Sequence, residues 1–392
     1  MKEWIKISDL LFFQEGPGVR NTQYTQSGVK LLNVANLVNG KVDLSTSDRY
    51  ISEDEAYGRY KHFLCDDGDF IIASSGIKVE YFDRKMGFVD SSMLPLCMNT
   101  STIRFKVIDS KRLNIKYFMY YLKSIHFKQQ LSKFITGSAQ LNFGPSHLKK
   151  MNMPLVSLKE QNDIVEKLSK VELLLDKYNG EIKLLDELIK ARFVEMFGDP
   201  VVNDKKWEIR YFSDLGELKR GKSKHRPRND PILLGGKYPL IQTGDVTNSN
   251  TYIKSYTSTY SEEGLKQSKM WKKGTLCITI AANIAESAIL TFDACFPDSV
   301  VGFTPNDEVI SLFIHYWLSF LQPILEENAP AVAQKNLNVA TLEKVGVIVP
   351  PLELQNQFAS FVQEIDKSRS RIQKSLEASQ ELFDSLMQEY FG

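Results

Sequence analysis

The sequence predicts an α+β protein in which an antiparallel two-helix coiled coil separates two globular domains. The chain has 392 residues, enough for more than one ordinary core. Two observations lead to this prediction: part of the chain repeats itself 194 residues later, and each copy of the repeat ends in a long stretch with heptad spacing. The whole chain is therefore expected to be a pseudo-twofold internal repeat.

The repeat needs no insertion or deletion over about sixty residues. Upstream of it a weaker echo pairs Trp4 with Trp207, at a slightly longer offset. The segment in which the two copies match closely looks helical, whereas the segment before it differs between the copies. This is typical of a constant scaffold that carries variable surfaces. The matching segments are Ala139-Gln140-x-Asn142 with Ala333-Gln334-x-Asn336, Leu158-x-x-Gln161-Asn162 with Leu352-x-x-Gln355-Asn356, and Glu195-x-Phe197-Gly198 with Glu389-x-Phe391-Gly392.

Apolar residues at alternating steps of four and three predict one long helix over 157–198 and a second over 351–392. Such helices are roughly 60 Å long at 1.5 Å per residue. We therefore expect them to pair with each other; the alternative is two ordinary core helices of a helical domain. Gly198 is expected to end the first helix. The predicted seam consists of Leu168, Leu175, Ile182 and Ile189 in the first helix, and Val362, Ile365, Ile372, Leu376 and Phe383 in the second.

The remaining segments, 1–156 and 199–350, form a first and a second head, each the size of one domain. Both consist of short apolar segments broken by turns, and both end in an aromatic-rich helix. The predicted strands of the first head are 29–37, 67–73 and 87–89, before a helix over 115–134. Those of the second head are 238–242, 274–280 and 288–292, before a helix over 309–325.

Composition excludes several classes of protein. The chain is 43% hydrophobic and 25% charged with a net charge of +1, so any nucleic-acid site must come from local clusters of basic residues. The four cysteines are far apart, and we expect reduced thiols, no metal site and a cytoplasmic location. No apolar run is long enough to span a membrane, so we expect no membrane partner.

The strongest local signal for a binding site is a basic run in the second head, which contains six basic residues and no acidic one. Because two prolines follow, the run should be a flexible loop suited to phosphate oxygens; an ordinary solvated surface loop is the alternative. In the first head the matching glycine-rich stretch offers Arg20, and Lys78, Arg84 and Lys85 are further candidates. The basic residues of the run are Lys219, Arg220, Lys222, Lys224, Arg226 and Arg228.

The same run contains a P-loop pattern, Gly216 to Ser223. A functional P-loop needs a buried strand before it and a helix that starts at the Lys-Ser pair, and the prolines argue against that helix. The other motifs of nucleotide, methyl-group and hydrolytic chemistry are missing from the sequence. We therefore predict no catalytic residues and a binding subunit; the alternatives are a non-enzymatic coiled-coil scaffold and a P-loop nucleotide hydrolase.

At this point the sequence resembles a known family, the specificity subunits of type I restriction–modification systems. The resemblance covers essentially the whole chain. It is most specific at Lys219-Arg220-Gly221-Lys222-Ser223, at Asn229 to Asp245, at the segment that opens the second long helix, and at Met196-Phe197-Gly198-Asp199-Pro200.

The resemblance implies two target-recognition domains, each of which reads one half of a bipartite sequence in double-stranded DNA. It also implies that the helices set the spacer and bind two modification subunits. Those subunits would hold S-adenosylmethionine, so that this chain itself binds no cofactor, and separate restriction and translocase subunits complete the enzyme. Side chains that hydrogen-bond to base edges are expected in the loops of the heads: Ser75 in the first head, and Gln242, Thr243 and Asn283 in the second.

Overall fold

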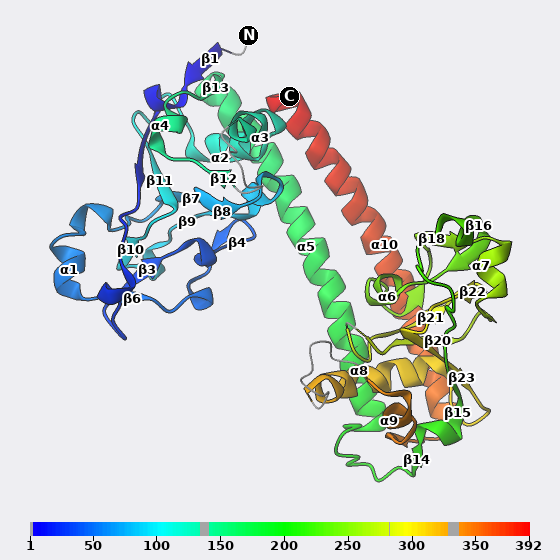
Figure 1. The fold of residues 1–392 in the computed structure, drawn as a ribbon. Coiled ribbons are helices and arrows are strands. Elements are labelled where there is room, and N and C mark those ends of the chain that lie inside the picture. Colours follow the sequence, from blue (N-terminus) through cyan, green and yellow to red (C-terminus); the bar gives the residue numbers. More distant parts are fainter. Residues whose placement is uncertain (1–2, 134–140, 282, 328–336) are drawn as a thin grey trace. The chain divides into compact units, whose positions relative to one another are not determined.

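The computed structural model describes residues 3–133, 141–281, 283–327 and 337–392, arranged in two units (Figure 1). Unit 1 comprises 1–178 and 375–392, and unit 2 comprises 179–374, so that each unit holds one head and half of each long helix. The repeated pairs Ala139-Gln140 and Ala333-Gln334, together with Asn336, lie outside the described residues.

In unit 1 the head contains two main sheets and a ribbon of two strands. All neighbours in the larger sheet are antiparallel, whereas β3 in the smaller sheet runs parallel to β10. The larger sheet has the order β2 (Leu11–Glu15), β11 (Thr102–Val107), β7 (Phe70–Ala73) and β9 (Met86–Phe88). The smaller sheet has the order β10 (Leu96–Met98), β3 (Val29–Leu32) and β6 (Tyr50–Ile51), and the ribbon pairs β1 (Glu3–Lys6) with β13 (Asn152–Leu155).

The described part of the first head also contains two further strand pairs, short 3-10 helices and four α-helices. The pairs are β4 (Leu37–Val38) with β5 (Lys41–Val42), and β8 (Ser75–Ile77) with β12 (Leu141–Asn142). The helices are α1 (Glu53–Tyr57), α2 (Ile115–Lys123), α3 (Ile125–Ser132) and α4 (Pro145–Leu148).

The second head repeats this plan in unit 2. Its larger sheet has the order β15 (Gly216–Arg220), β23 (Val300–Pro305), β20 (Leu276–Thr279), β21 (Ser287–Leu290) and β17 (Tyr252–Ile253). Its smaller sheet has the order β18 (Ser258–Tyr260), β16 (Leu234–Leu240), β22 (Ala294–Cys295) and β19 (Met270–Trp271), and its ribbon pairs β14 (Ile209–Tyr211) with β24 (Gly346–Ile348). The helices are α6 (Thr243–Thr247), α7 (Glu262–Lys266), α8 (Ser311–Glu327) and α9 (Val339–Glu343).

The strand register shows that the heads are equivalent even where their sequences have drifted. In each smaller sheet one parallel pair places a buried cysteine beside a leucine: Cys97 beside Leu31, and Cys295 beside Leu240. The α+β prediction and the internal repeat are therefore confirmed, and the repeat extends through both heads.

The register also corrects the predicted echo of the two tryptophans. Trp4 pairs with Pro154 in the ribbon of the first head. The repeat makes Ile348 the equivalent of Pro154, and Ile348 pairs with Ile209. Trp207 instead precedes its ribbon, and its indole Nε1 donates a hydrogen bond to the carbonyl oxygen of Phe197 at 2.8 Å. Trp4 is therefore equivalent to Ile209, not to Trp207.

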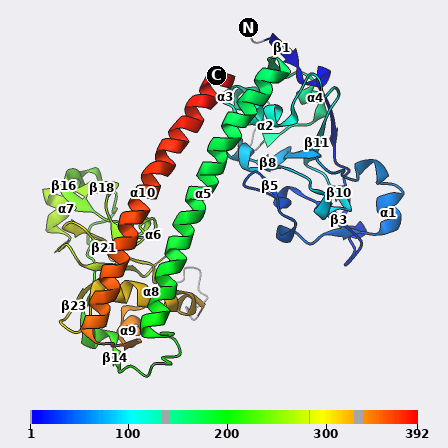
Figure 2. The same ribbon diagram turned by 180° about the vertical axis from the view of Figure 1, so that it is seen from behind.

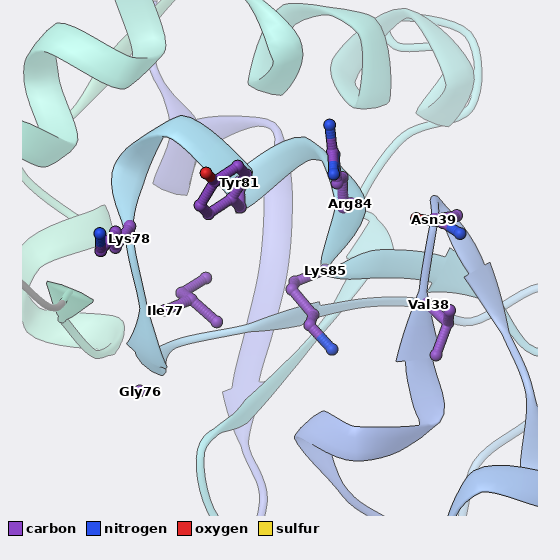
Figure 3. A pocket seen from close by; sticks show the side chains of 8 residues that line it. All are labelled: Val38, Asn39, Gly76, Ile77, Lys78, Tyr81, Arg84 and Lys85. Carbon is purple, nitrogen blue, oxygen red and sulfur yellow. The ribbon is translucent and has the colours of Figure 1, made fainter. Parts of the chain in front are cut away.

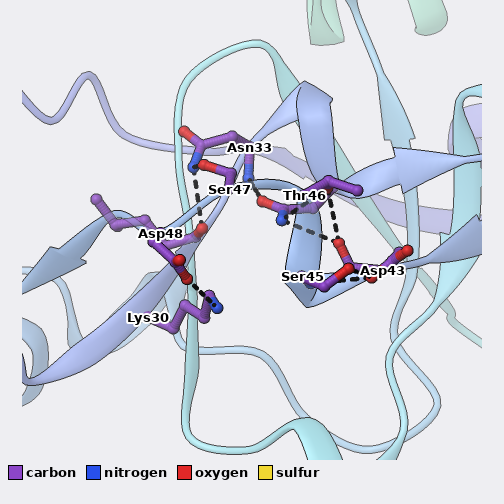
Figure 4. A network of polar contacts seen from close by, with 9 residues as sticks. Lys30, Asn33, Asp43, Ser45, Thr46, Ser47 and Asp48 are labelled. Atoms are coloured by element: carbon purple, nitrogen blue, oxygen red, sulfur yellow. Dashed lines mark hydrogen bonds and ion pairs between the residues drawn. The ribbon is translucent and has the colours of Figure 1, made fainter. Parts of the chain in front are cut away.

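The strand predicted over 29–37 is wrong beyond Leu32, because asparagine side chains compete with the strand ladder for the backbone. The Asn36 side chain is fully buried; it accepts a hydrogen bond from the Asn33 amide at 2.9 Å and donates one to the carbonyl oxygen of Asp43 at 3.0 Å. Figure 4 shows the surrounding network, in which Asn33 reaches Ser47. The chain therefore turns at 34–36 before β4.

The helix predicted over 115–134 is in fact two helices, α2 and α3. Ser124, between them, has extended backbone angles (φ −72°, ψ 156°), and its hydroxyl accepts a hydrogen bond from the amide of Phe127. A serine in this position caps the second helix and ends the first. The other predicted strands and the helix over 309–325 are present, with bounds that differ by a few residues.

The two long helices are α5 (Leu158–Phe197) and α10 (Leu352–Phe391), each of 40 residues. In unit 1 the first half of α5 lies beside the end of α10, and the Lys167 ammonium contacts the Tyr390 hydroxyl at 3.3 Å. In unit 2 the second half of α5 lies beside the first half of α10 (Figure 2). Arg369 of α10 forms an ion pair with Asp186 of α5 there. The helices therefore run antiparallel, as predicted.

The predicted seam faces inward along both helices. Leu168, Ile189 and Val362 are buried. The six other predicted positions are partly buried: Leu175, Ile182, Ile365, Ile372, Leu376 and Phe383. Gly198 ends α5 with a φ of +77° and an amide that donates to the carbonyl oxygen of Val194 at 2.8 Å, which confirms the predicted stop.

One repeated glutamine joins each long helix to its head. The Gln161 Oε1 accepts from the Asn114 amide at 2.9 Å, and its Nε2 donates to the carbonyl oxygens of Arg112 and Val156 at 2.8 and 2.9 Å. Gln355 makes the matching contacts in unit 2. Both side chains are fully buried, so this part of the repeat encodes a joint between helix and head.

In unit 2, Gln355 Oε1 accepts from the Ile310 amide at 3.1 Å, and Nε2 donates to the carbonyl oxygens of Glu308 and Pro350, both at 2.9 Å. Replacement of Gln355 by Leu would remove the side-chain partner of these three backbone groups, of which the carbonyl oxygen of Pro350 belongs to a buried residue. We expect this to lower the free energy of unfolding by about 2–4 kcal/mol, measured by guanidinium denaturation. The exposed Gln357 is the matched control, and equal losses in Gln355→Leu and Gln357→Leu would contradict the proposed joint.

A second prediction concerns His315, whose ring is buried against the Ser287 hydroxyl at 3.0 Å. Burial lowers the pKa of His315 to about 4. An unfolded chain binds this proton near pH 6.5, so His315 should lower stability progressively from about pH 6.5 to 4, by at most about 1.4 kcal/mol per pH unit. His315→Gln should remove that part of the pH slope measured by denaturation, whereas His62→Gln at an exposed site should not. Parallel slopes for the parent and His315→Gln would contradict the assignment.

Candidate nucleic-acid interface

The same edge of the larger sheet carries the variable loops in both heads. Because neighbouring strands are antiparallel, β2 and β7 end at the edge where β9 and β11 begin. Backbone hydrogen bonds close this edge, from the Gly16 amide to the carbonyl oxygen of Thr102 at 2.9 Å and from the Ser74 amide to that of Ser101 at 2.8 Å. We call this end of the sheet the loop edge.

The second head has the same loop edge, formed where β15 and β20 end. Here the Gly221 amide donates to the carbonyl oxygen of Val300 at 2.9 Å, and the Ile280 amide donates to that of Ser299 at 3.1 Å. The strands and their hydrogen bonds are shared between the heads, but the connections that leave the edge differ in length and charge.

The predicted binding residues lie in connections at or beside these edges. In the first head Arg20 follows β2, and Ser75 to Lys85 connect β7 to β9. In the second head the basic run leads from β15 toward β16, and Asn283 lies between β20 and β21. Arg20 and the basic run therefore follow equivalent strands, whereas Lys78, Arg84 and Lys85 lie in a different connection of the same scaffold.

In the first head Lys78, Arg84 and Lys85 line one cavity of about 410 Å³. Figure 3 shows residues 76–85 on one side of this first cavity and Val38 with Asn39 on the other. The Arg84 guanidinium lies 5.2 Å from the centre of the half-exposed Tyr81 ring. The neighbouring Asp83 is not part of the lining, because its carboxylate pairs with Lys128 at 3.0 Å. The lining thus has three cations and no carboxylate.

Two other predicted residues of the first head are not part of this cavity. Arg20 is exposed, and its backbone amide donates to Gln23 Oε1 at 3.0 Å. The Ser75 hydroxyl is bound to that of Ser101 at 2.7 Å. The Ser75 side chain therefore already has a hydrogen-bond partner within the head.

The basic run of the second head is partly neutralised by acidic residues that are distant in the sequence. Asp298 lies 3.6 Å from the Arg226 guanidinium and also forms an ion pair with Arg228. Lys219 pairs with Glu217. Lys222 and Lys224, like Arg220 at the end of β15, are exposed and form no ion pair within the described part of the chain.

The predicted loop is wrong for Lys219 and Arg220, which end strand β15, and is confirmed from Gly221 onward, where the chain forms no helix. The backbone of this loop is held by hydrogen bonds. Gln267 Oε1 accepts from the amides of Lys224 at 2.5 Å and His225 at 3.1 Å. The Ser268 hydroxyl donates to the carbonyl oxygen of Lys222 at 2.9 Å. At Gly221 a Cβ atom would lie 2.3 Å from two backbone oxygens, so only glycine permits this close approach.

A second cavity of about 230 Å³ brings Arg228, Gln242 and Thr243 together, although the sequence separates them by up to 15 residues. Asn283 is not part of the lining; its amide donates to the Thr247 hydroxyl at 3.4 Å, at the end of α6. The sequence analysis did not name several residues of this lining as site residues. Four of them lie in the segments where the family resemblance is most specific: Ser223, Asn229, Leu234 and Leu240. The missed residues are Ser223, Asn229, Leu234, Leu240, Tyr260, Pro297 and Ser299.

The P-loop hypothesis is wrong. In a P-loop the first residues of the motif would form a loop around the phosphate. Here Gly216–Arg220 form strand β15, which pairs along its length with β23. No helix begins at Lys222-Ser223, because the chain runs without regular structure to Pro231. The backbone therefore lacks the helix N-terminus that binds phosphate in a P-loop.

Other chemistries find little support within the described residues. The four cysteines are free thiols in buried positions, and burial raises the pKa of Cys65 and Cys97 to about 12. Across the parts of the chain that the structure describes, no three His, Cys, Asp or Glu side chains gather as metal ligands. None of the described helices combines the length and apolarity that crossing a membrane requires.

Comparison with known proteins gives a consistent picture. The family model described as "Type I restriction modification DNA specificity domain" matches twice, over residues 2–185 and 204–380. Two relatives from Methanocaldococcus jannaschii are named the putative type I restriction enzyme MjaX specificity subunit and the type I restriction enzyme MjaVIII specificity subunit. They are 26% identical over 66% of this chain and 25% identical over 44% of it. The matched regions span 64% and 40% of the lengths of these relatives.

The fold is also that of a solved specificity subunit. The crystal structure of the S subunit of a type I restriction–modification system from M. genitalium superposes with a TM-score of 0.58, at 16% identity, over 100% of this chain and 96% of that one. The two matched domains cover both heads and most of both long helices. The chain therefore belongs to the family of type I restriction–modification DNA specificity domains, and it contains two copies of that domain.

Proposed function

We propose that this chain is the DNA-recognition subunit of a type I restriction–modification enzyme, and that each head reads one half of a bipartite, asymmetric target. The observation that carries this proposal is that equivalent sheets present different connections at the same loop edge. A constant scaffold with different loops suits two different half-sites on one DNA molecule. The family to which the chain belongs and the printed names of its relatives support the same function.

In the first head, the first cavity would contact the DNA backbone. Lys78, Arg84 and Lys85 supply positive charge without a neighbouring carboxylate in the lining, which suits phosphate oxygens. Tyr81 is about half exposed beside them and can pack against sugar or base.

In the second head, Lys222 and Lys224 would make the phosphate contacts, and Arg226 and Arg228 would join them after exchanging Asp298 for phosphate. Gln242, Thr243 and Asn283 carry amide and hydroxyl groups of the kind that hydrogen-bond to base edges. Arg20 and Ser75 in the first head, and Lys219 and Arg220 at the end of β15, stay candidates for supporting contacts.

The long helices would set the spacer and bind two modification subunits. Leu188 on α5 and Leu382 on α10 are equivalent in the repeat, and they are 46% and 50% exposed. Two matched apolar positions suit two copies of one partner, since a pseudo-twofold frame offers the same surface twice. The modification subunits would hold S-adenosylmethionine and the catalytic residues, restriction and translocase subunits would complete the enzyme, and the complex would act in the cytoplasm.

A map of methylated bases in the host genome, with this gene intact and deleted, tests the proposal directly. Loss of one bipartite methylated motif on deletion is the expected result. If the motifs are unchanged, and the purified complex also shows no salt-dependent affinity for DNA, the alternative of a coiled-coil scaffold is favoured instead.

Replacing basic and acidic residues at the loop edge of the second head should change DNA binding in opposite directions. In the complex with its partner subunits, Lys222→Gln with Lys224→Gln should reduce the slope of log K against log salt by about 2, since each lost phosphate contact removes about 0.9. Asp298→Asn should instead strengthen DNA binding, by up to about fivefold, because Arg226 and Arg228 lose a competing carboxylate.

Asp293→Asn is the matched control, because Asp293 lies in the same head but pairs with Lys272 at 2.8 Å. Binding is measured by fluorescence anisotropy over a range of salt concentrations. Equal strengthening by Asp293→Asn and Asp298→Asn would show an effect of net charge alone and would contradict the assigned contact.

The matched leucines predict a defined loss of partner subunits. Leu188→Asp and Leu382→Asp should each remove one modification subunit from the complex, and the double variant should remove both, as read by native mass spectrometry. Leu173 is an exposed control, because its repeat counterpart is Lys367 and the pair does not form a matched apolar surface. Full occupancy in the double variant would rule out docking at these positions.

A further inference from the structure

The second cavity has the composition of a site for an uncharged, flat ligand. Leu234, Leu240, Tyr260 and Pro297 provide apolar walls. Hydroxyl and amide groups interrupt these walls, and they come from Ser223, Asn229, Gln242, Thr243 and Ser299. Apolar walls with a few convergent polar groups are typical of sites that bind a small organic group.

Ser223 gives an independent sign that a ligand group is missing. This residue is only 6% exposed, and its buried hydroxyl has no hydrogen-bond partner within the described residues. Its neighbours Lys222 and Lys224 are both fixed through their backbones, by Ser268 and Gln267. A buried hydroxyl without a partner costs stability unless a ligand or water satisfies it, and the fixed backbone holds it in place.

The polar groups fit a nucleobase better than a phosphate. Arg228 contributes the positive charge of the lining, whereas Lys222 and Lys224, the exposed lysines of the same loop, are not part of it. Phosphate is normally bound by unpaired cations and backbone amides, whereas amides and hydroxyls match the donors and acceptors of a base edge.

The concave shape restricts which base can enter. In an intact duplex the base edges lie at the floor of a groove about 8.5 Å deep, where protruding elements reach them. A concave cavity of about 230 Å³ is reached instead by a base that has left the stack.

We propose that the second cavity binds a single unstacked nucleobase, with Ser223 and Gln242 hydrogen-bonding to its edge and Leu240 and Tyr260 packing against the ring. The proposal deepens the proposed DNA-reading function of the second head and rests on it. It makes Ser223 a specificity-determining residue that acts beside the phosphate contacts of Lys222 and Lys224.

Saturation-transfer NMR on the full chain tests this with the four deoxynucleosides as probes and inorganic phosphate as competitor. At least one deoxynucleoside should receive saturation at its base protons, and phosphate should not displace it. Ser223→Ala should weaken this binding about five- to tenfold, the equivalent of one hydrogen bond. The thermal midpoint of Ser223→Ala should equal or exceed that of the parent, because the variant removes an unsatisfied hydroxyl.

Ser370→Ala, at an exposed position of α10, is the matched control and should bind like the parent. Absence of transfer to every deoxynucleoside would overturn the proposal, and so would displacement by phosphate or unchanged binding in Ser223→Ala. Because DNA binding of the assembled complex is measured separately, a failure here with salt-dependent DNA binding intact would refute the base site alone.

Discussion

The joint between a long helix and its head is the constraint on which the rest of the molecule depends. In each unit the side-chain amide of one buried glutamine forms hydrogen bonds with three backbone groups. An amide and a carbonyl oxygen lie just before a helix of the head, and the second carbonyl oxygen lies just before the long helix. Both glutamine side chains are fully buried, so a shift of the long helix against the head would leave their amide groups without hydrogen-bond partners. The loop edge is therefore carried on a head whose attachment to the frame is the same in both copies.

This attachment separates what the repeat keeps from what it varies. The two matching phenylalanines at the ends of the long helices have different aromatic partners: Phe391 packs on Tyr117 and Tyr121 of α2 in unit 1, and Phe197 packs on Phe313 of α8 and Phe358 of α10 in unit 2. Beyond the joint, the cores of the heads are filled differently. Arg104 on β11 is buried with Asp69 at 3.2 Å, whereas the equivalent position on β23 is Gly302, over which Trp271 lies. One topology thus tolerates an ion pair in one head and an aromatic ring in the other.

The tertiary structure revises the predicted role of the charged residues more than that of the apolar residues, because it brings acidic residues from distant segments next to basic ones. The basic run contains no acidic residue, yet Asp298, in the connection from β22 to β23, forms ion pairs with two of its arginines. Such exposed pairs are weak and exchangeable. A loop of this kind can be held in one arrangement in the free protein and still offer its arginines to phosphate oxygens, which compete for the same guanidinium groups.

The sequence by itself determined the frame. Heptad spacing, the position of Gly198 and the 194-residue repeat depend on local periodicity and on matching residues along the chain, and these are visible without coordinates. The α+β class of the heads and the basic loop could be predicted for the same reason. Only the tertiary structure decided that Trp4 corresponds to Ile209, that two asparagines end a strand at Leu32, and that Ser223 and Gln242 line one cavity. Those features depend on strand register and on side chains brought together from distant segments, which a single sequence does not encode as a local pattern.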